Sequence, residues 1–168
     1  MEKNPTYLFV AAAALIDQKG RILVQKRPEG KPMAGLWEFP GGKVELGETP
    51  EVALIRELHE ELEIRVEEPD IKPVAFASEA LDDQHLILLL YICRKWTGLV
   101  LSPQSLDLQW LSVAAIRELP MPPADGPLVE MLSHVLRRPT YTEAQSSVFG
   151  ESVVFRDTCP LPRRAGFG

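Results

Sequence analysis

The sequence contains little cysteine and no long hydrophobic run. Two of its 168 residues are cysteines, Cys93 and Cys159, which is too few for a framework of disulfide bonds. Cys93 lies within an apolar run, so we interpret it as a small buried hydrophobic residue. No apolar stretch approaches the roughly 20 residues that a membrane-spanning helix requires. The sequence therefore argues against a disulfide-stapled scaffold and against a membrane partner.

Basic residues are also fewer than acidic residues. The chain has 18 basic and 24 acidic residues, which gives a net charge of −6. Proteins that bind nucleic acid duplexes rely on Lys and Arg to neutralise phosphates, so we expect no polynucleotide partner. A small phosphorylated ligand bridged by a metal ion is compatible with this charge.

A targeting signal is not expected at the N-terminus. Residues 7–16 are apolar, but Glu2 accompanies Lys3 before them, so the basic flank of a signal peptide is weak. Cleavage near Ala13 would also remove the run that best fits a first strand. We therefore expect a cytoplasmic protein.

The hydrophobic content is ordinary and predicts one compact domain. The chain is 45% hydrophobic and 25% charged, which suits a globular protein with a good core. Runs typical of strands cover residues 7–16, 21–26, 71–78, 85–94 and 108–111. Helical patterns cover residues 50–62, 113–118 and 126–136. Strands interleaved with few helices predict an α/β fold with a mixed sheet covered on both faces.

The last thirty residues differ in composition from the rest. From residue 139 onward Thr, Glu, Gln, Ser, Pro and Arg dominate, interrupted by short apolar pairs and triplets. We expect a domain over residues 1–138 and a C-terminal tail over residues 139–168, either disordered or loosely docked. The sequence does not indicate what the tail does.

The most informative stretch, residues 42–64, ends in a cluster of carboxylates. If residues 50–62 are helical, Glu57, Glu60 and Glu61 lie on one face, within an arc of roughly 100°. Like charges at this spacing destabilise a helix by about 0.2–0.5 kcal/mol per pair, so a compensating cation is expected. A hard divalent cation such as Mg²⁺ prefers these oxygen ligands. The alternative is an ordinary solvated face of a helix.

The residues before this helix favour the metal site over the solvated face. Gly41 and Gly42 predict a tight turn with exposed backbone, and Thr49 followed by Pro50 is typical of an N-cap and a first helical residue. The order along the chain is then loop, helix start and metal-binding face.

The spacing of these residues resembles the Nudix box, G-x5-E-x7-R-E-U-x-E-E-x-G-U, in which U is aliphatic. The conserved polar and glycine positions of that pattern are occupied here by Gly42, Glu48, Arg56, Glu57, Glu60 and Glu61. One position departs, because Glu63 stands where the family has a glycine that caps the helix. A residue with a Cβ in that left-handed conformation costs on the order of 1 kcal/mol. We expect the departure to affect local stability more than chemistry.

The resemblance extends to the MutT-like branch of the family and covers about residues 7–138. Residues 22–27 and 35–40 are similar to its second strand and its L-E-F-P-G-G-K lead-in, and residues 122–127 to its P-P-A-N-x-P segment. This resemblance implies the α/β/α Nudix sandwich with a mixed β-sheet. It also implies hydrolysis of a nucleoside triphosphate between the α and β phosphates with Mg²⁺, for which Mn²⁺ is a possible substitute.

The resemblance implies roles for the residues of the box. Glu60 and Glu61 bind metal together with the carbonyl of Gly41. Glu57 is the general base or a shared metal ligand, and Arg56 orients it through a charge-assisted bond. We expect Glu48 to be structural and to hold the loop.

Substrate contacts are expected outside the helix. Gly42 and Lys43 are candidates to meet a phosphate, although an exposed lysine after a glycine turn is often only solvated. Arg27 and Phe39 match positions that contact the nucleotide in MutT-like enzymes. Phe39 has the alternative of being a core aromatic beside Trp37.

One loop position also departs from the family pattern. Gln104 stands six residues before Trp110, where the family often has a glutamate, and Gln cannot serve as a base or an anionic ligand. Asp107 lies nearby and could substitute. We favour Glu57 as the base.

Asp125 stands where the resemblance places the Asn that reads the base. An ionised Asp only accepts hydrogen bonds, and donors on guanine, 8-oxoguanine or cytosine would all suit it. We predict hydrolysis of 8-oxo-dGTP to 8-oxo-dGMP and pyrophosphate, which sanitises the nucleotide pool, by a monomer or weak dimer. The alternative is CTP or oxidised or methylated cytosine nucleotides. A non-catalytic nucleotide-binding module is disfavoured because the charged residues of the box are all present.

Overall fold

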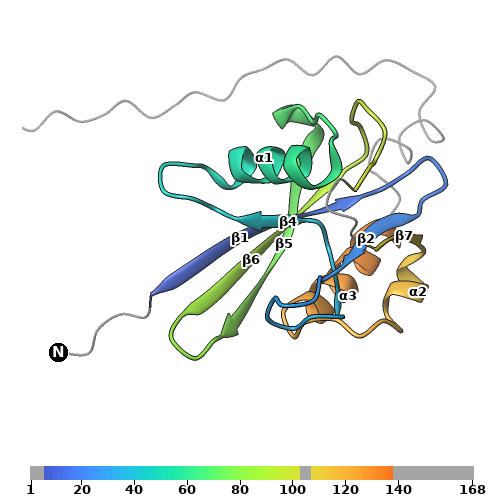
Figure 1. Ribbon diagram of the computed structural model, residues 1–168. Helices are drawn as coiled ribbons and strands as arrows, with labels where there is room; N and C mark the ends of the chain where they lie inside the picture. The colour runs from blue at the N-terminus through green and yellow to red at the C-terminus, as the bar shows by residue number, and fades with distance from the viewer. Residues whose placement is uncertain (1–5, 103–106, 138–168) are drawn as a thin grey trace, which may run out of the picture. The chain divides into compact units, whose positions relative to one another are not determined.

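The computed structural model describes residues 6–102 and 107–137, which form an α/β fold with two sheets (Figure 1). The larger sheet is mixed and has the order β4-β1-β6-β5, in which β1 and β6 run parallel and the other pairs are antiparallel. Its strands are β1 (Tyr7–Leu15), β4 (Gly41–Lys43), β5 (Ile71–Ala80) and β6 (His85–Cys93). The predicted mixed sheet is confirmed.

A second, antiparallel sheet of three strands has the order β3-β2-β7. Its strands are β2 (Ile22–Lys26), β3 (Trp37–Glu38) and β7 (Leu108–Leu111). The helices are α1 (Pro50–Leu62), α2 (Val113–Ile116) and α3 (Asp125–Arg137), with a 3₁₀ turn η1 (Glu68–Asp70). No helix among the described residues is long and apolar enough to cross a membrane.

β3, β4 and the division into two sheets were not predicted from the sequence. β3 has two residues and β4 has three, so neither carries a pattern that periodicity can detect. Gly41 and Gly42, which we expected in a tight turn, instead pair with β1 as part of β4.

Two apolar layers lie on opposite faces of the mixed sheet. On one face α1 buries Leu54, Leu58 and Leu62, each with 0% exposure, in a cluster with alternate residues of β1. On the other face, Leu128 and Leu132 of α3 pack in a second cluster with Ala12 and Ala14 of β1. Figure 1 shows α1 and α3 on the two sides of this sheet, so the expectation of a sheet covered on both faces is confirmed.

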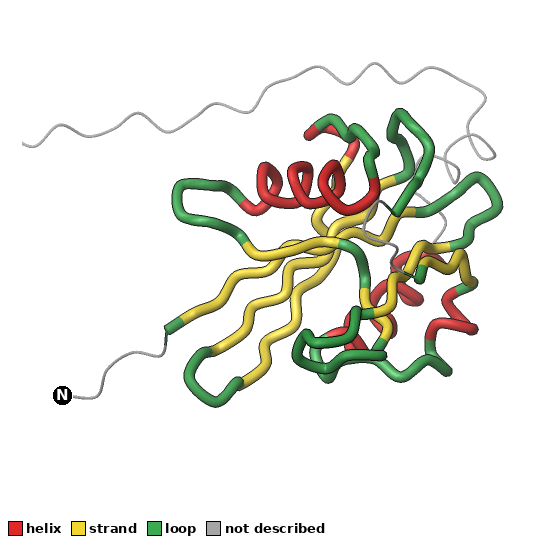
Figure 2. Tube along the Cα trace, viewed as in Figure 1, coloured by secondary structure: helices red, strands yellow, loops and turns green. Residues whose placement is uncertain are grey.

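The ends of α1 follow the expected local rules. Thr49 is the N-cap, and its Oγ1 accepts a hydrogen bond from the Val52 N–H at 3.3 Å. At the other end Glu63 has a φ of 57° and a ψ of 21°, and its N–H donates to the His59 carbonyl at 3.0 Å. The left-handed cap is therefore present with a glutamate in the place of glycine. The reversal after it lets Ile64 enter the core. Figure 2 shows the long loop that joins β4 to the start of this helix.

Candidate active site

Arg56 joins α1 to the loop that precedes it. Its Nε donates to Glu48 Oε1 at 2.8 Å and its Nη2 to Glu48 Oε2 at 3.0 Å, a two-point contact between a guanidinium and a carboxylate. The Nη2 also donates to the Lys43 carbonyl at 3.2 Å. These bonds tie the chain on both sides of the loop to the helix.

Glu48 completes this tie from the loop side. It accepts a hydrogen bond from the Glu45 N–H at 3.1 Å in addition to those from Arg56. The hydrogen bonds from Arg56, and then that from the Glu45 backbone, lower the pKa of Glu48 to about 2. The Glu48 carboxylate is therefore ionised at neutral pH and is already engaged by protein donors.

Arg56 also holds the next residue along the helix. Its Nη1 donates to Glu57 Oε1 at 2.7 Å and reaches Glu60 Oε2 at 3.4 Å. The Glu57 side chain is 18% exposed, whereas that of Glu60 is 55% exposed. The Glu57 carboxylate is thus held in place and mostly buried, whereas the Glu60 carboxylate is exposed to solvent.

Neither glycine of β4 has room for a side chain, because atoms of other elements lie close to its Cα. A Cβ on Gly42 would lie 2.2 Å from Cδ of Glu57, so any side chain there displaces this carboxylate. A Cβ on Gly41 would lie 2.1 Å from the Ala11 carbonyl oxygen, and its φ of +151° also disfavours a side chain. The pair therefore lets the backbone of β4 lie directly against α1 and β1.

Glu61 lies deeper than the other carboxylates of the helix. Its Oε2 accepts a hydrogen bond from Gln25 Nε2 at 3.0 Å, and the backbone of Gly41 provides a further bond. Burial raises the pKa of Glu61, and repulsion from Glu57 and Glu38 adds to the rise, while the bonds from Gln25 and Gly41 oppose it. The ionised form of Glu61 is therefore disfavoured by burial and by repulsion, and a nearby cation would stabilise it.

The predicted metal ligands are neighbours, but their side chains do not converge. Within residues 6–102 and 107–137, no three His, Cys, Asp or Glu side chains are arranged to hold a metal ion. Glu57 and Glu60 turn to Arg56, while Glu61 turns to Gln25. Their chemistry nevertheless fits a hard divalent cation, because the donors are carboxylates and one of them is desolvated and repelled by its neighbours.

Asp125 lies at the first position of α3 and is 5% exposed. Its Oδ1 accepts a hydrogen bond from the Phe39 N–H at 3.5 Å. Burial, followed by repulsion from Glu38, raises the pKa of Asp125 to about 7, although the Phe39 N–H and Arg27 act in the opposite direction. The ionised carboxylate only accepts hydrogen bonds, as the sequence-based prediction assumes, whereas the protonated form of Asp125 would also donate one.

The other expected substrate contacts occupy varied surroundings. Arg27 forms an ion pair with Glu38, and its Nε donates to the Pro32 carbonyl at 2.8 Å. The Phe39 ring is 3% exposed and belongs to the same core cluster as Trp37. Its position fits the core alternative, and its backbone N–H is the group that bonds to Asp125.

The remaining candidate residues make few contacts or lie outside the described residues. Lys43 is exposed, and its side chain makes no hydrogen bond or ion pair with the part of the chain that the structure describes. Gln104 lies outside the described residues. Asp107 is exposed, and its carbonyl accepts the Lys26 N–H at 2.9 Å.

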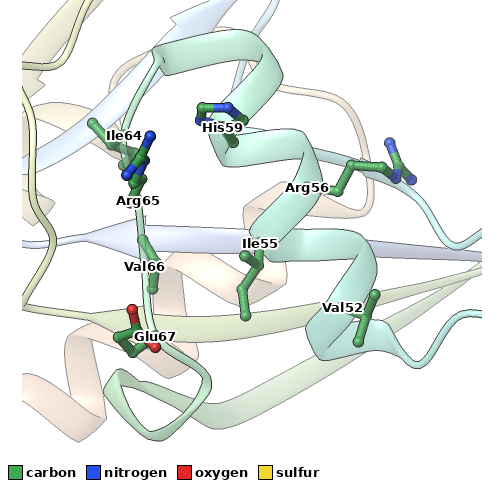
Figure 3. A pocket seen from close by; sticks show the side chains of 8 residues that line it. All are labelled: Val52, Ile55, Arg56, His59, Ile64, Arg65, Val66 and Glu67. Atoms are coloured by element: carbon green, nitrogen blue, oxygen red, sulfur yellow. The ribbon is translucent and has the colours of Figure 1, made fainter.

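A surface hollow of about 430 Å³ lies beside α1, and none of Glu57, Glu60 and Glu61 lines it. It is lined by Val52, Ile55 and His59 of the helix and by residues 64–67 (Figure 3). Arg56 also lines it, and Figure 3 shows this side chain pointing away from residues 64–67. Neither Glu61 nor Asp125 lines the hollow, so it is not the place where the expected catalytic and base-reading residues meet.

Gln25 and Glu38 lie at the site but were not predicted from the sequence. Gln25 contacts Glu61, while Glu38 lies close enough to both Glu61 and Asp125 to raise the pKa of each. A signal for Gln25 was present, because a polar residue in an otherwise apolar strand calls for a partner. Glu38 carries no comparable signal.

Comparison with known proteins identifies the family. The NUDIX domain profile matches residues 6–132. The 8-oxo-dGTP diphosphatase of Escherichia coli (strain K12) is 31% identical over 133 residues, which cover 76% of this chain and 98% of that protein. The CTP pyrophosphohydrolase of the same organism is 36% identical over 123 residues, covering 73% of this chain and 89% of that protein.

A structural relative agrees with this assignment. The solution structure of the E. coli ORF135 protein matches with a TM-score of 0.71 at 33% identity and covers 81% of this chain and 96% of that one. Because the family profile spans most of the chain and the fold agrees, this protein belongs to the Nudix hydrolase family.

Proposed function

We propose that this Nudix hydrolase is a Mg²⁺-dependent nucleoside triphosphate pyrophosphohydrolase that converts 8-oxo-dGTP to 8-oxo-dGMP and pyrophosphate. The observation that carries the proposal is the placement of Glu57 by Arg56, with the desolvated Glu61 beside it. The likeness to an 8-oxo-dGTP diphosphatase over 98% of that protein supports the choice of substrate. Such an enzyme would remove oxidised precursors before DNA replication uses them, and we expect it to act in the cytoplasm as a monomer or weak dimer.

The metal site in this proposal consists of Glu57, Glu60, Glu61 and the carbonyl of Gly41. When held by these oxygens, a divalent ion would neutralise charge on phosphate oxygens and make water a better nucleophile. Mn²⁺ could replace Mg²⁺, because both accept the same oxygen donors.

The protein side chains orient the reacting groups. Arg56 holds Glu57 at 2.7 Å in one orientation, so its carboxylate can receive a proton from an attacking water. Gly42 leaves no side chain between β4 and this carboxylate. The exposed ammonium of Lys43, next in the chain, is available to a phosphate. Glu48 acts only through Arg56.

Asp125 is proposed to read the base through its protonation state. When protonated it offers one donor and one acceptor, which complement the adjacent O6 and N7–H of 8-oxoguanine. When ionised it offers acceptors alone, which suit the exocyclic amine of cytosine. Its pKa of about 7 makes both forms available near neutral pH. Arg27 and the backbone of Phe39 lie at the same place.

Hydrolysis of CTP or of oxidised or methylated cytosine nucleotides is the second candidate. It is favoured by the presence of an aspartate at position 125 and by the 36% identity to a CTP pyrophosphohydrolase. The deciding experiment is pyrophosphate release with Mg²⁺ from 8-oxo-dGTP, dGTP, CTP and 5-hydroxy-dCTP, compared by kcat/KM. A preference for 8-oxo-dGTP over the other three supports the proposal. A preference for either cytosine nucleotide transfers it to the second candidate, and no release from any nucleotide contradicts both.

A further inference from the structure

Gln25 occupies a position where the fold would ordinarily place an apolar side chain. In β2 the side chains alternate, and Ile22 and Val24 belong to the core cluster on one side while Leu23 belongs to the cluster under α1. Gln25 follows this alternation onto the α1 side and is only 3% exposed. Burying an amide costs free energy unless both of its ends find partners.

Only one end of the Gln25 amide has a partner. Its Nε2 donates to Glu61 Oε2 at 3.0 Å. Its Oε1 is buried and is the single buried side-chain N or O atom of the described residues that has no hydrogen-bond partner. Exchanging the two ends would not help, because it would set the amide oxygen against the oxygen of an ionised carboxylate.

The backbone of Gln25 is held rigidly opposite the end of α1. β2 is the central strand of its sheet, and Gln25 pairs with Glu38 of β3 on one side and with Leu108 of β7 on the other. The two strand pairings therefore fix the backbone of Gln25, from which the side-chain amide reaches Glu61. The vacant acceptor stays beside Glu61, where the backbone of Gly41 also approaches.

We propose that Gln25 is a positioning residue for the metal site, in which Nε2 orients the Glu61 carboxylate and Oε1 accepts a hydrogen bond from a water of the bound cation's hydration shell. Mg²⁺ keeps several of its waters when bound to proteins, and those waters are donors. Groups that orient metal ligands in this way contribute to metal affinity without contacting the metal. The inference rests on the proposed metal-dependent function.

The first test measures Mn²⁺ binding to the nucleotide-free protein by electron paramagnetic resonance. Gln25→Met keeps the length of the side chain but removes its donor and acceptor, and we expect its Kd for Mn²⁺ to rise about 10- to 100-fold. Val24→Ala is the matched control, since it perturbs the same buried strand on its other face, and its Kd should change less than twofold. Circular dichroism and the Tm verify that both variants are folded. Equal Kd values for Gln25→Met and wild type would overturn the inference.

A double-mutant cycle separates positioning from packing. If Gln25 acts through Glu61, Gln25→Met should weaken Mn²⁺ binding less in the Glu61→Gln background than in the wild-type background. Fully additive losses would show that Gln25 affects the site by a route other than Glu61 and would overturn the inference.

The vacant acceptor has its own spectroscopic test. In protein labelled with ¹⁵N-glutamine, the side-chain amide signal of Gln25 is identified by its loss in Gln25→Met. It should shift during a Mg²⁺ titration with the same Kd as the site, while a Gln25 signal unmoved at saturating Mg²⁺ would overturn the role of Oε1. These readouts need no turnover. Loss of Mn²⁺ affinity in Gln25→Met together with no pyrophosphate release by the wild type would therefore support the inference while contradicting the proposed function.

Discussion

Replacement of Gly42 by alanine tests how closely the backbone of β4 must approach the proposed base. The added Cβ would lie 2.2 Å from Cδ and 2.4 Å from Oε1 of Glu57, whereas ordinary contacts of a Cβ begin near 3.4 Å. The carboxylate must therefore move by about 1 Å or more. A misplacement of about 1 Å in a catalytic group can cost on the order of 100-fold in rate, so we expect kcat for Gly42→Ala to fall by about that factor.

The fold should tolerate this change better than the chemistry does. The atom that yields is the end of a side chain that is 18% exposed, so it can rotate toward solvent at the expense of its bond to Arg56. Losing a hydrogen bond between charged groups costs about 1.5–3 kcal/mol at most, and less where solvent replaces it. We expect a Tm within a few degrees of the wild type.

The assay is steady-state pyrophosphate release, with the Tm measured in parallel. Gly126→Ala is the control, because a Cβ there meets no atom within 4 Å and its φ is not positive. This control should keep its turnover and gain slightly in stability. If Gly42→Ala retained more than half of the wild-type kcat, the placement of Glu57 against β4 would not matter for the reaction.

Three further variants test separate parts of the account. Because burial raises the pKa of Asp125 to about 7, preference for 8-oxo-dGTP over CTP in kcat/KM should fall as the pH rises through about 7. Asp125→Asn should remove this dependence, whereas a profile unchanged by this substitution would contradict the proposed role of Asp125. Glu63→Gly should raise the Tm relative to Glu63→Ala, since only glycine relieves the positive φ, and a lower Tm would contradict the strain. The pKa of Glu48 falls from 4.5 to about 2 on folding, so its contribution to stability is present above pH 4.5 and is lost as the pH falls toward 2. Glu48→Gln should therefore lower the Tm at pH 7 but hardly at pH 2, and an equal loss at both would be inconsistent with the ion pair.

The parts of the molecule that follow local rules could be predicted from the sequence. Thr49 and Pro50 define the start of α1, and Glu63 marks its left-handed end, because caps depend on residues within a few positions of each other. The box motif also places Arg56 next to Glu57 on that helix, and the structure shows the bond between them.

The features that depend on distant neighbours were not predictable in this way. β3 and β4 exist through pairing with strands far along the chain, and their own sequences are too short to show a period. The raised pKa of Asp125 depends on burial and on Glu38, neither of which the P-P-A-D-G-P segment reveals. The side-chain directions of Glu57 and Glu61, toward Arg56 and Gln25, likewise follow from tertiary contacts and not from helical spacing.

In the proposed reaction Glu57 serves a metal-dependent cleavage between the α and β phosphates. The most direct measurement follows the products of 8-oxo-dGTP with Mg²⁺ for the wild type and for Glu57→Gln, before and after chelation by EDTA. We predict 8-oxo-dGMP and pyrophosphate from the wild type, no turnover after chelation, and a kcat lowered by at least about 100-fold in Glu57→Gln. Release of orthophosphate, turnover that survives chelation, or a loss below tenfold in Glu57→Gln would contradict the account.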